Sequence, residues 1–286
     1  MAAPMPEVAG VEHRFAEVNG FRMHYAEAGT GDPLILQHGW PQHWYAWRHQ
    51  IAPLAERYRV IVPDLRGYGW SEAPRSGYEK SQFARDVVAL LDELGIEKAR
   101  YAGHDWGAVV AYRLAIEHPE RFERVAALAA PPPWREGPPP PQVMLAFLAY
   151  QSLVSAPFAG SFVMRNGLAR RMLGAARSAG EFTEEELAIY DDRWKEPARA
   201  NASVQTYRTW LIKELPSAMR GEFEGKRLNV PTLVLMGRRE LLMKMLQPEV
   251  YERKGDDVRT EYADCGHWVP EEAPEAVTEH LLDFFA

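Results

Sequence analysis

The sequence predicts an α/β fold: a mostly parallel central sheet flanked by helices, with a helical lid inserted into it. Short apolar runs alternate with segments of helical pattern, at 34–37, 59–62, 100–102 and 125–130. Strands that alternate with helices form βαβ units, whose parallel sheet has helices on both faces. The alternation stops at the prolines 131–133. It resumes with apolar runs at 230–235 and 258–262, and the residues between are mostly helix-forming.

The elements before the first parallel strand form a predicted hairpin. Residues 11–18 and 21–28 flank Asn19-Gly20, a strong signal for a two-residue turn. A first helix is expected over 44–57. A second places Val87, Leu90, Leu91 and Leu94 on one face and should end at Gly95.

The remaining elements complete the sheet and its cover. A strand at 98–102 precedes a segment, 108–116, that is apolar on nearly every side, as a buried helix is. A last helix carries apolar residues at helical spacing near 277–284. We therefore expect a core domain made of residues 1–133 and 216–286, and a lid domain at 134–215.

Composition narrows the class of protein. The 286 residues carry a formal net charge of −7, which gives no reason to expect nucleic acid or an anionic membrane as a partner. The single cysteine, Cys265, leaves no internal disulfide and fits a reducing compartment. The first ten residues lack the basic region and apolar run of a secretory signal. We expect a cytoplasmic protein, and the sequence leaves open whether it is a monomer or a homodimer.

The segment 103–107, Gly-His-Asp-Trp-Gly, places an aspartate where a serine usually stands. Small residues two places before and after a nucleophile permit the sharp strand-to-helix turn that exposes its side chain. A carboxylate is poorly suited to cleave esters, but it can displace a leaving group from saturated carbon and leave an ester on the enzyme. Asp105 therefore points to epoxides and alkyl halides as substrates. The alternative is that Asp105 only caps the following helix.

Three further pieces fit such a nucleophile. The backbone N–H groups of Trp40, in His-Gly-Trp-Pro after a strand, and of Trp106 are candidates for an oxyanion hole. His267, in the loop after the last strand, is a candidate general base. Glu240 follows the preceding strand and is the candidate that orients His267, although it could also be a surface acid. We expect the nearby His38 and His104 to be packing and hydrogen-bonding residues.

The chain resembles the epoxide hydrolase branch of the α/β-hydrolases from about residue 21 to its end. The resemblance rests on HGWPQHWYAWR (38–48), RVIVPDLRGYGWSE (59–72), GHDWGAVVAYRLAIEHPERF (103–122) and CGHWVPEEAP (265–274). It implies an α/β-hydrolase fold and phenols that bind the epoxide oxygen, matched here by Tyr207 and, on a looser local likeness, by Tyr150. The chain departs from the family at Glu240, where aspartate is more usual.

The resemblance implies an epoxide hydrolase that needs no metal and no organic cofactor. Asp105 would open an apolar epoxide from the side opposite Tyr150 and Tyr207. His267, oriented by Glu240, would then activate water against the ester, giving a vicinal diol.

Two other functions are compatible with parts of the pattern. A haloalkane or haloacid dehalogenase uses the same nucleophile and base. However, haloalkane dehalogenases often place asparagine where Trp40 stands, and fluoroacetate dehalogenases usually place arginine where Trp106 stands. A non-catalytic binding module is the third possibility, and the intact nucleophile and base count against it.

Overall fold

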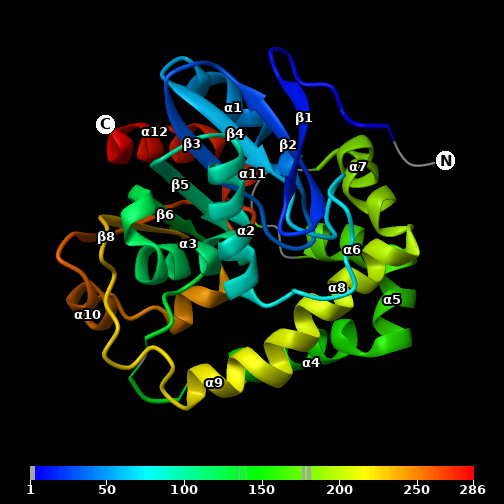
Figure 1. Ribbon diagram of the computed structural model, residues 1–286. Helices are drawn as coiled ribbons and strands as arrows, with labels where there is room; N and C mark the ends of the chain where they lie inside the picture. The colour runs from blue at the N-terminus through cyan, green and yellow to red at the C-terminus, as the bar shows by residue number, and fades with distance from the viewer. Residues whose placement is uncertain (1–3, 135, 139, 176–177, 179–181) are drawn as a thin grey trace.

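The computed structural model describes residues 4–134, 136–138, 140–175, 178 and 182–286 (Figure 1). Within these residues, eight strands form one sheet in the order β1-β2-β4-β3-β5-β6-β7-β8. Their bounds are β1 Glu12–Val18, β2 Phe21–Ala28, β3 Asp32–Gln37, β4 Tyr58–Pro63, β5 Ala99–His104, β6 Phe122–Leu128, β7 Thr232–Gly237 and β8 Val258–Ala263. The pairs β1–β2 and β2–β4 are antiparallel and the other five pairs are parallel. The expected mostly parallel sheet is confirmed.

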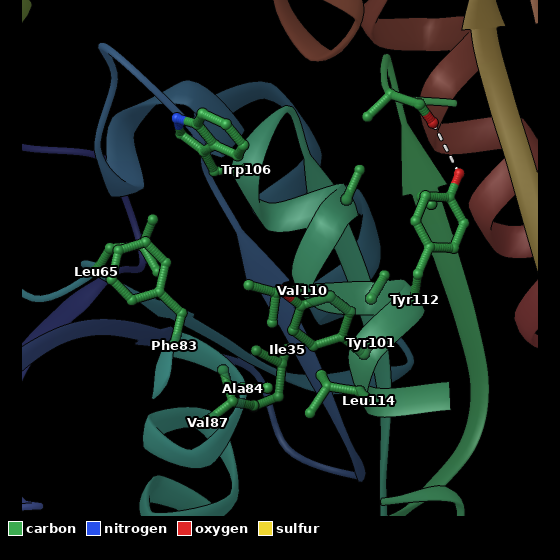
Figure 2. Packing of buried hydrophobic residues seen from close by; sticks show 14 of the residues in the cluster. Ile35, Leu65, Phe83, Ala84, Val87, Tyr101, Trp106, Val110, Tyr112 and Leu114 are labelled. Carbon is green, nitrogen blue, oxygen red and sulfur yellow. Dashed lines mark hydrogen bonds between the residues drawn. The ribbon is translucent and has the colours of Figure 1, made fainter. Parts of the chain in front are cut away.

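Helices cover both faces of the sheet, as the βαβ pattern predicts. One face packs against α1 (Arg48–Ala55), α11 (Val269–Glu272) and α12 (Pro274–Phe285), and the other against α2 (Lys80–Glu93) and α3 (Trp106–Glu117). Neighbouring strand residues alternate between the two cores: Leu34 and Leu36 face α1 and α12, whereas Ile35 packs with residues of α2 and α3 (Figure 2). Central strands buried on both faces therefore appear in the sequence as uninterrupted apolar runs.

Some elements differ in extent from the sequence prediction. The helix expected over 44–57 divides into a 3₁₀ turn, η1 (Trp44–Trp47), and α1. The strand expected at 125–130 is β6, which starts earlier and stops before Ala129, where φ is +58°. The strand expected at 230–235 is β7, which begins after Pro231 because proline has no N–H to donate to a ladder.

A run of helices separates β6 from β7 and lies to one side of the sheet, coloured green to yellow in Figure 1. It comprises α4 Pro141–Ser155, α5 Pro157–Arg165, α6 Leu168–Ala175, α7 Glu184–Trp194, α8 Pro197–Thr209, the π-helix η3 Trp210–Glu214 and α9 Leu215–Met219. We call this run the lid. Its exact domain boundaries at 133/134 and 215/216 stay a prediction. The remaining short helices are η2 Pro119–Arg121, η4 Leu241–Met245, α10 Pro248–Tyr251 and η5 Glu252–Lys254.

Buried hydrogen bonds attach α7 and α8 to loops of the core. The indole N–H of Trp194 donates to the carbonyl of Pro41 at 2.8 Å, and Arg193 Nε donates to that of Gly69 at 2.9 Å. Arg199 donates to the carbonyl of Ser71 at 2.6 Å. These bonds hold one half of the lid in a fixed place relative to the sheet edge, because a buried carbonyl without its donor would be costly.

In the described part of the chain, no single helix combines the length and apolar character of a membrane span. The pair α4 and α5 would combine them only across a bend of 92°.

Candidate active site

Asp105 occupies a sharp turn between β5 and α3. Its backbone has φ 54° and ψ −113°, a conformation that residues other than glycine rarely adopt. The turn leaves no room for a side chain at Gly103, where a Cβ would lie 2.1 Å from the carbonyl oxygen of Gly107. The amide of Asp105 donates to the carbonyl of Leu128 at 3.0 Å, which fixes the turn to the neighbouring strand β6. The strained turn expected for a nucleophile is therefore present.

The loop after β3 holds the Asp105 carboxylate. The backbone N–H of Trp40 donates to Oδ1 of Asp105 at 2.7 Å. Gly39 permits this approach, because a Cβ there would lie 2.3 Å from the same oxygen. The backbone N–H of Trp106 is the first of α3, where an amide has no partner inside the helix. Of the two amides expected to form an oxyanion hole, that of Trp40 therefore binds the carboxylate directly, and that of Trp106 follows Asp105 in the chain. Oδ2 of Asp105 is the carboxylate oxygen that the Trp40 amide does not bind.

His267 connects Asp105 with Glu240. Its Nε2 lies 3.7 Å from Oδ2 of Asp105, and its Nδ1 lies 2.6 Å from Oε1 of Glu240. The Glu240 side chain is 3% exposed, so it is not the surface acid of the alternative interpretation. The other oxygen of Glu240, Oε2, is buried and has no hydrogen-bond partner among the described residues. Glu240, although one methylene longer than the aspartate usual in the family, therefore contacts the imidazole of His267 directly.

Asp105, His267 and Glu240 form a row of charged side chains, and each shifts the pKa values of its neighbours in this row. Burial disfavours the imidazolium of His267, but the nearby Glu240 and Asp105 carboxylates outweigh it and raise the pKa of His267 to about 10. Burial also disfavours the Asp105 carboxylate, yet its hydrogen bond and charge interaction with His267 hold the pKa of Asp105 below its ordinary value. Burial raises the pKa of Glu240, against the opposing effect of His267. In the resting site, His267 is therefore a cation between two acids.

The lid places both expected tyrosines over this row. Tyr207, on α8, is 1% exposed, and its ring centroid lies 5.2 Å from that of Trp40 and 5.5 Å from that of Trp106. Tyr150, on α4, has its ring 5.8 Å from that of Tyr207 and stacks on Trp40 at 6.2 Å. Burial, with the negative charge of Asp105 adding to it, raises the pKa of both phenols. Both tyrosines are therefore protonated and able to donate.

Two neighbours support the tyrosine pair without having been anticipated from the sequence. Gln151 donates from Nε2 to the phenol oxygen of Tyr150 at 3.3 Å. The indole N–H of Trp40 donates to Oγ of Ser203, on α8, at 2.8 Å. Serine and glutamine are common in helices of any kind, so neither residue carried a signal that could be read along the chain.

The two histidines near the site have packing and hydrogen-bonding roles, as expected. The ring of His38 is wholly buried, with Nδ1 2.9 Å from the carbonyl of Gly39 and Nε2 accepting from the amide of Leu65 at 3.0 Å. His104 donates from Nε2 to the carbonyl of His267 at 2.8 Å. Burial lowers the pKa of His104 to about 3, so the ring is neutral and holds the backbone of His267.

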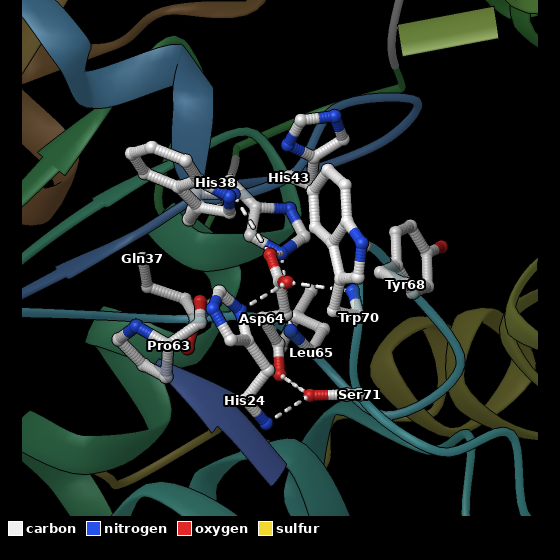
Figure 3. Close-up of polar contacts among 12 residues, drawn as sticks. His24, Gln37, His38, His43, Pro63, Asp64, Leu65, Tyr68, Trp70 and Ser71 are labelled. Atoms are coloured by element: carbon white, nitrogen blue, oxygen red, sulfur yellow. Dashed lines mark hydrogen bonds and ion pairs between the residues drawn. The ribbon is translucent and has the colours of Figure 1, made fainter. Parts of the chain in front are cut away.

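A buried aspartate organises the loops beneath the site and was not singled out from the sequence. Asp64, after β4, accepts from the amides of Trp44 and Trp70, both at 2.8 Å, and pairs with His24 at 2.7 Å (Figure 3). Despite full burial, the neighbouring histidines keep the pKa of Asp64 well below its ordinary value. The carboxylate thus ties together the loops that follow β3 and β4.

The part of the chain that the structure describes contains no group of three or more His, Cys, Asp and Glu side chains arranged to hold a metal ion. The expectation that the protein needs no cofactor stays a prediction.

Comparison with known proteins places this geometry in a family. Residues 32–274 match the model of a protein family whose description is "alpha/beta hydrolase fold". The chain belongs to the α/β-hydrolase family. It is 34% identical to a soluble epoxide hydrolase of Corynebacterium sp. (strain C12), over 96% of this chain and 98% of the relative. It is 31% identical to epoxide hydrolase A of Mycobacterium tuberculosis (strain ATCC 25618 / H37Rv), over 95% and 96%.

A solved structure agrees with the sequence relatives. The epoxide hydrolase CorEH without ligand superposes with a TM-score of 0.85 at 32% identity, covering 96% of this chain and 98% of that one. These similarities confirm the resemblance to the epoxide hydrolase branch that the motifs indicated.

Proposed function

We propose that this α/β-hydrolase converts an apolar epoxide into a vicinal diol through a covalent ester on Asp105. The observation that carries the proposal is the nature of the nucleophile: a carboxylate stands at the strained turn, with two protonated phenols of the lid facing it. The near full-length similarity to named epoxide hydrolases supports the same activity.

The first step forms the ester. Oδ1 of Asp105 is held by the Trp40 amide, so Oδ2 attacks a ring carbon and the bond from that carbon to the epoxide oxygen breaks. The oxygen leaves as an alkoxide and takes a proton from a phenol of Tyr150 or Tyr207. Tyr150 suits this role because its oxygen already accepts from Gln151, which stabilises the phenolate that forms.

The ester changes the charge balance at His267. Once Asp105 is alkylated, its negative charge is gone, and one of the two acids that hold the pKa of His267 near 10 no longer acts. His267 then releases a proton, which replaces the one that the phenol gave. The imidazole is thereby neutral when a base is required.

The second step hydrolyses the ester. Neutral His267 takes a proton from water, whose oxygen attacks Cγ of Asp105. The amides of Trp40 and Trp106 stabilise the oxyanion that develops on Oδ1, as preorganised donors do. The intermediate then collapses: the Cγ–Oδ2 bond breaks, and the leaving diol oxygen takes the remaining proton of the added hydroxyl. This frees the carboxylate of Asp105 and leaves the imidazolium between Asp105 and Glu240, as in the resting site.

The side chains around the nucleophile favour an apolar substrate. The ring of Tyr207 packs against Trp40 and Trp106, and Trp106 in turn packs against Trp210. Phe147 lies 5.6 Å from Tyr150 between ring centroids. Aromatic walls with a few placed donors are typical of sites for small apolar ligands. We propose no other partner than this epoxide and water, and we propose a cytoplasmic location because the single cysteine leaves no internal disulfide.

One observation favours a dehalogenase as the second candidate. The indole N–H of Trp106 is buried without an acceptor among the described residues, and a leaving halide could accept from it. The corresponding indole N–H of Trp40 is already used by Ser203, so a second donor from that residue is missing. The site therefore matches an epoxide hydrolase better than a dehalogenase.

A single turnover in ¹⁸O water tests the mechanism. With enzyme in excess over an aryl epoxide, each enzyme molecule turns over once. One oxygen of the diol is that of the epoxide, and the added oxygen comes from Asp105 rather than from water. The diol should therefore be unlabelled, and Asp105 should carry ¹⁸O in a peptide mass spectrum. A labelled diol in the first turnover would contradict the ester. Asp105→Asn is the control, and halide release from a bromoalkane without diol formation from the epoxide would identify the dehalogenase instead.

A further inference from the structure

Lys80 is a charged residue with no exposed surface, at the first position of α2. Removing an ammonium group from water is costly unless several partners compensate, and lysine is rarely buried completely. The contacts of its Nζ should therefore explain why the chain keeps a charge in this place.

The ammonium group of Lys80 joins the core to the lid. Its Nζ lies 2.7 Å from Oε2 of Glu214, the last residue of η3, and donates to the carbonyl oxygen of Thr206, in α8, at 3.0 Å. It also lies 4.4 Å from the ring centroid of Trp106, within the range of a cation–π contact. Three donors on one nitrogen allow it to serve three partners at once.

Two of these partners, Thr206 and Trp106, adjoin Tyr207. Thr206 precedes Tyr207 in α8, so Lys80 fixes the backbone immediately before the phenol. The Trp106 ring under the ammonium is the one on which the Tyr207 ring packs. Two residues after Tyr207, α8 ends and the π-helix η3 begins, an irregularity frequent at functional sites. Lys80 thus holds Tyr207 from its backbone and from the wall behind its ring.

Glu214 closes the arrangement. Its Oε1 accepts from the backbone N–H of Lys80 at 2.7 Å, so this carboxylate holds both ends of the same residue. The side chain of Glu214 is 8% exposed. The end of the π-helix is therefore tied to the start of α2, and the geometry of the turn that follows Tyr207 depends on this pair.

We propose that Lys80 is a positioning residue that fixes Tyr207 for donation to the epoxide oxygen. The inference rests on the proposed role of Tyr207 in forming the ester. The ammonium group of Lys80 contacts Thr206, Glu214 and the ring of Trp106, and its effect on Tyr207 passes through Thr206 and Trp106. It should therefore influence ester formation and leave ester hydrolysis alone.

The chain offers a matched control for this test. Lys213, in η3, pairs at 2.6 Å with Glu79, the residue immediately before α2, but the Lys213 side chain is 64% exposed. Lys80→Met and Lys213→Met each remove one lysine between α2 and η3, one buried beside Tyr207 and one on the surface. Among the described residues, Lys80→Met leaves the buried Glu214 with only the more distant Arg113, at 3.9 Å, as an ion-pair partner. A double variant, Lys80→Met with Glu214→Gln, therefore removes both charges together.

The two half-reactions are measured separately, by rapid quenching of a single turnover with an aryl epoxide. Lys80→Met, alone or with Glu214→Gln, should slow ester formation about tenfold to a hundredfold, the cost of a small misplacement of a catalytic group. Ester hydrolysis should be unchanged, and Lys213→Met should match the wild type in both steps. Ester formation at the wild-type rate in the double variant would overturn the proposal.

A cycle with Tyr207→Phe separates this inference from the proposed function. If Lys80 acts through Tyr207, Lys80→Met should have little further effect in the Tyr207→Phe background, because coupled residues are not additive. An equal loss in both backgrounds would overturn the inference and leave Tyr207 in its role. A wild-type rate in Tyr207→Phe alone would overturn the role of Tyr207 itself.

Discussion

Replacing Glu240 by glutamine removes one charge from the site and changes little else. In the wild type, Nδ1 of His267 lies 2.6 Å from Oε1 of Glu240. Glutamine has nearly the same shape as glutamate, and its carbonyl oxygen can still accept a hydrogen bond from this Nδ1–H. The tautomer of the imidazole is retained, whereas the ion pair is lost. The change therefore isolates the electrostatic part of what Glu240 does for the base.

The magnitude follows from the geometry of the pair. With the charge centres of Glu240 and His267 roughly 4 Å apart and an effective dielectric constant of about 20, their attraction is about 4 kcal/mol. That corresponds to about three pKa units. Glu240 is therefore a large part of the balance by which the two carboxylates, against burial, raise the pKa of His267 to about 10. Ester hydrolysis, which forms an imidazolium, should slow by up to about 10³-fold in Glu240→Gln. A loss of hydrogen-bond strength alone, about 1–2 kcal/mol, sets a floor near tenfold.

The assay separates the two steps of the reaction. Stopped-flow and rapid-quench experiments with an aryl epoxide should show ester formation close to the wild-type rate, since attack by Asp105 needs no base. The ester should then accumulate, seen as a mass increase on the intact protein. Because hydrolysis needs the neutral imidazole and Glu240→Gln lowers the pKa of His267, the acid-side fall of the hydrolysis rate should move to lower pH.

Glu240→Asp is the companion variant. It keeps the charge but withdraws the carboxylate by about 1.5 Å, one C–C bond, so we expect only partial recovery of hydrolysis. Identical pre-steady-state and steady-state behaviour of Glu240→Gln and the wild type, with no ester accumulating, would refute the assignment of Glu240 as the orienting acid.

Four further outcomes are expected. His267→Gln should trap the ester, so peptide mass spectrometry should find the adduct on Asp105, and rapid steady-state turnover by this variant would contradict the role of the base. Tyr207→Phe should slow ester formation about 10²–10³-fold, as loss of an oxyanion-hole donor does, measured in a single turnover. Gly39→Ala should abolish ester formation while the protein keeps its far-UV circular dichroism, because the new Cβ would lie 2.3 Å from Oδ1 of Asp105. Burial lowers the pKa of His43 to about 3, so the unfolded chain binds a proton there more readily, and the free energy of unfolding falls as pH decreases from 6.5 toward 3. In urea unfolding, His43→Gln should reduce this dependence of the free energy of unfolding on pH by about 1.4 kcal/mol per pH unit. An unchanged slope would count against the burial of a neutral His43.

Local patterns were sufficient for the strands, the helices and the strained turn at Asp105. Parallel strands buried on both faces are uninterrupted apolar runs, and a strained turn at Asp105 demands small residues at Gly103 and Gly107. Such requirements are written into neighbouring residues and can be read along the chain. The ends of elements were less well predicted, because Ala129 and Pro231 stop or delay strands through backbone geometry.

Other features depend on residues far apart in the chain. The sequence indicated that Glu240 follows a strand, but its contact with His267 depends on how the loops after β7 and β8 lie beside each other. Tyr150 and Tyr207 meet only because the lid folds back over the sheet edge. Lys80 gave no signal at all: a lysine at the start of a helix is ordinarily solvated, and only the packing of α2 against η3 removes it from water. Sequence determined the local requirements of this protein; tertiary structure decided which distant side chains share one buried space, because burial and pairing are properties of the assembled chain.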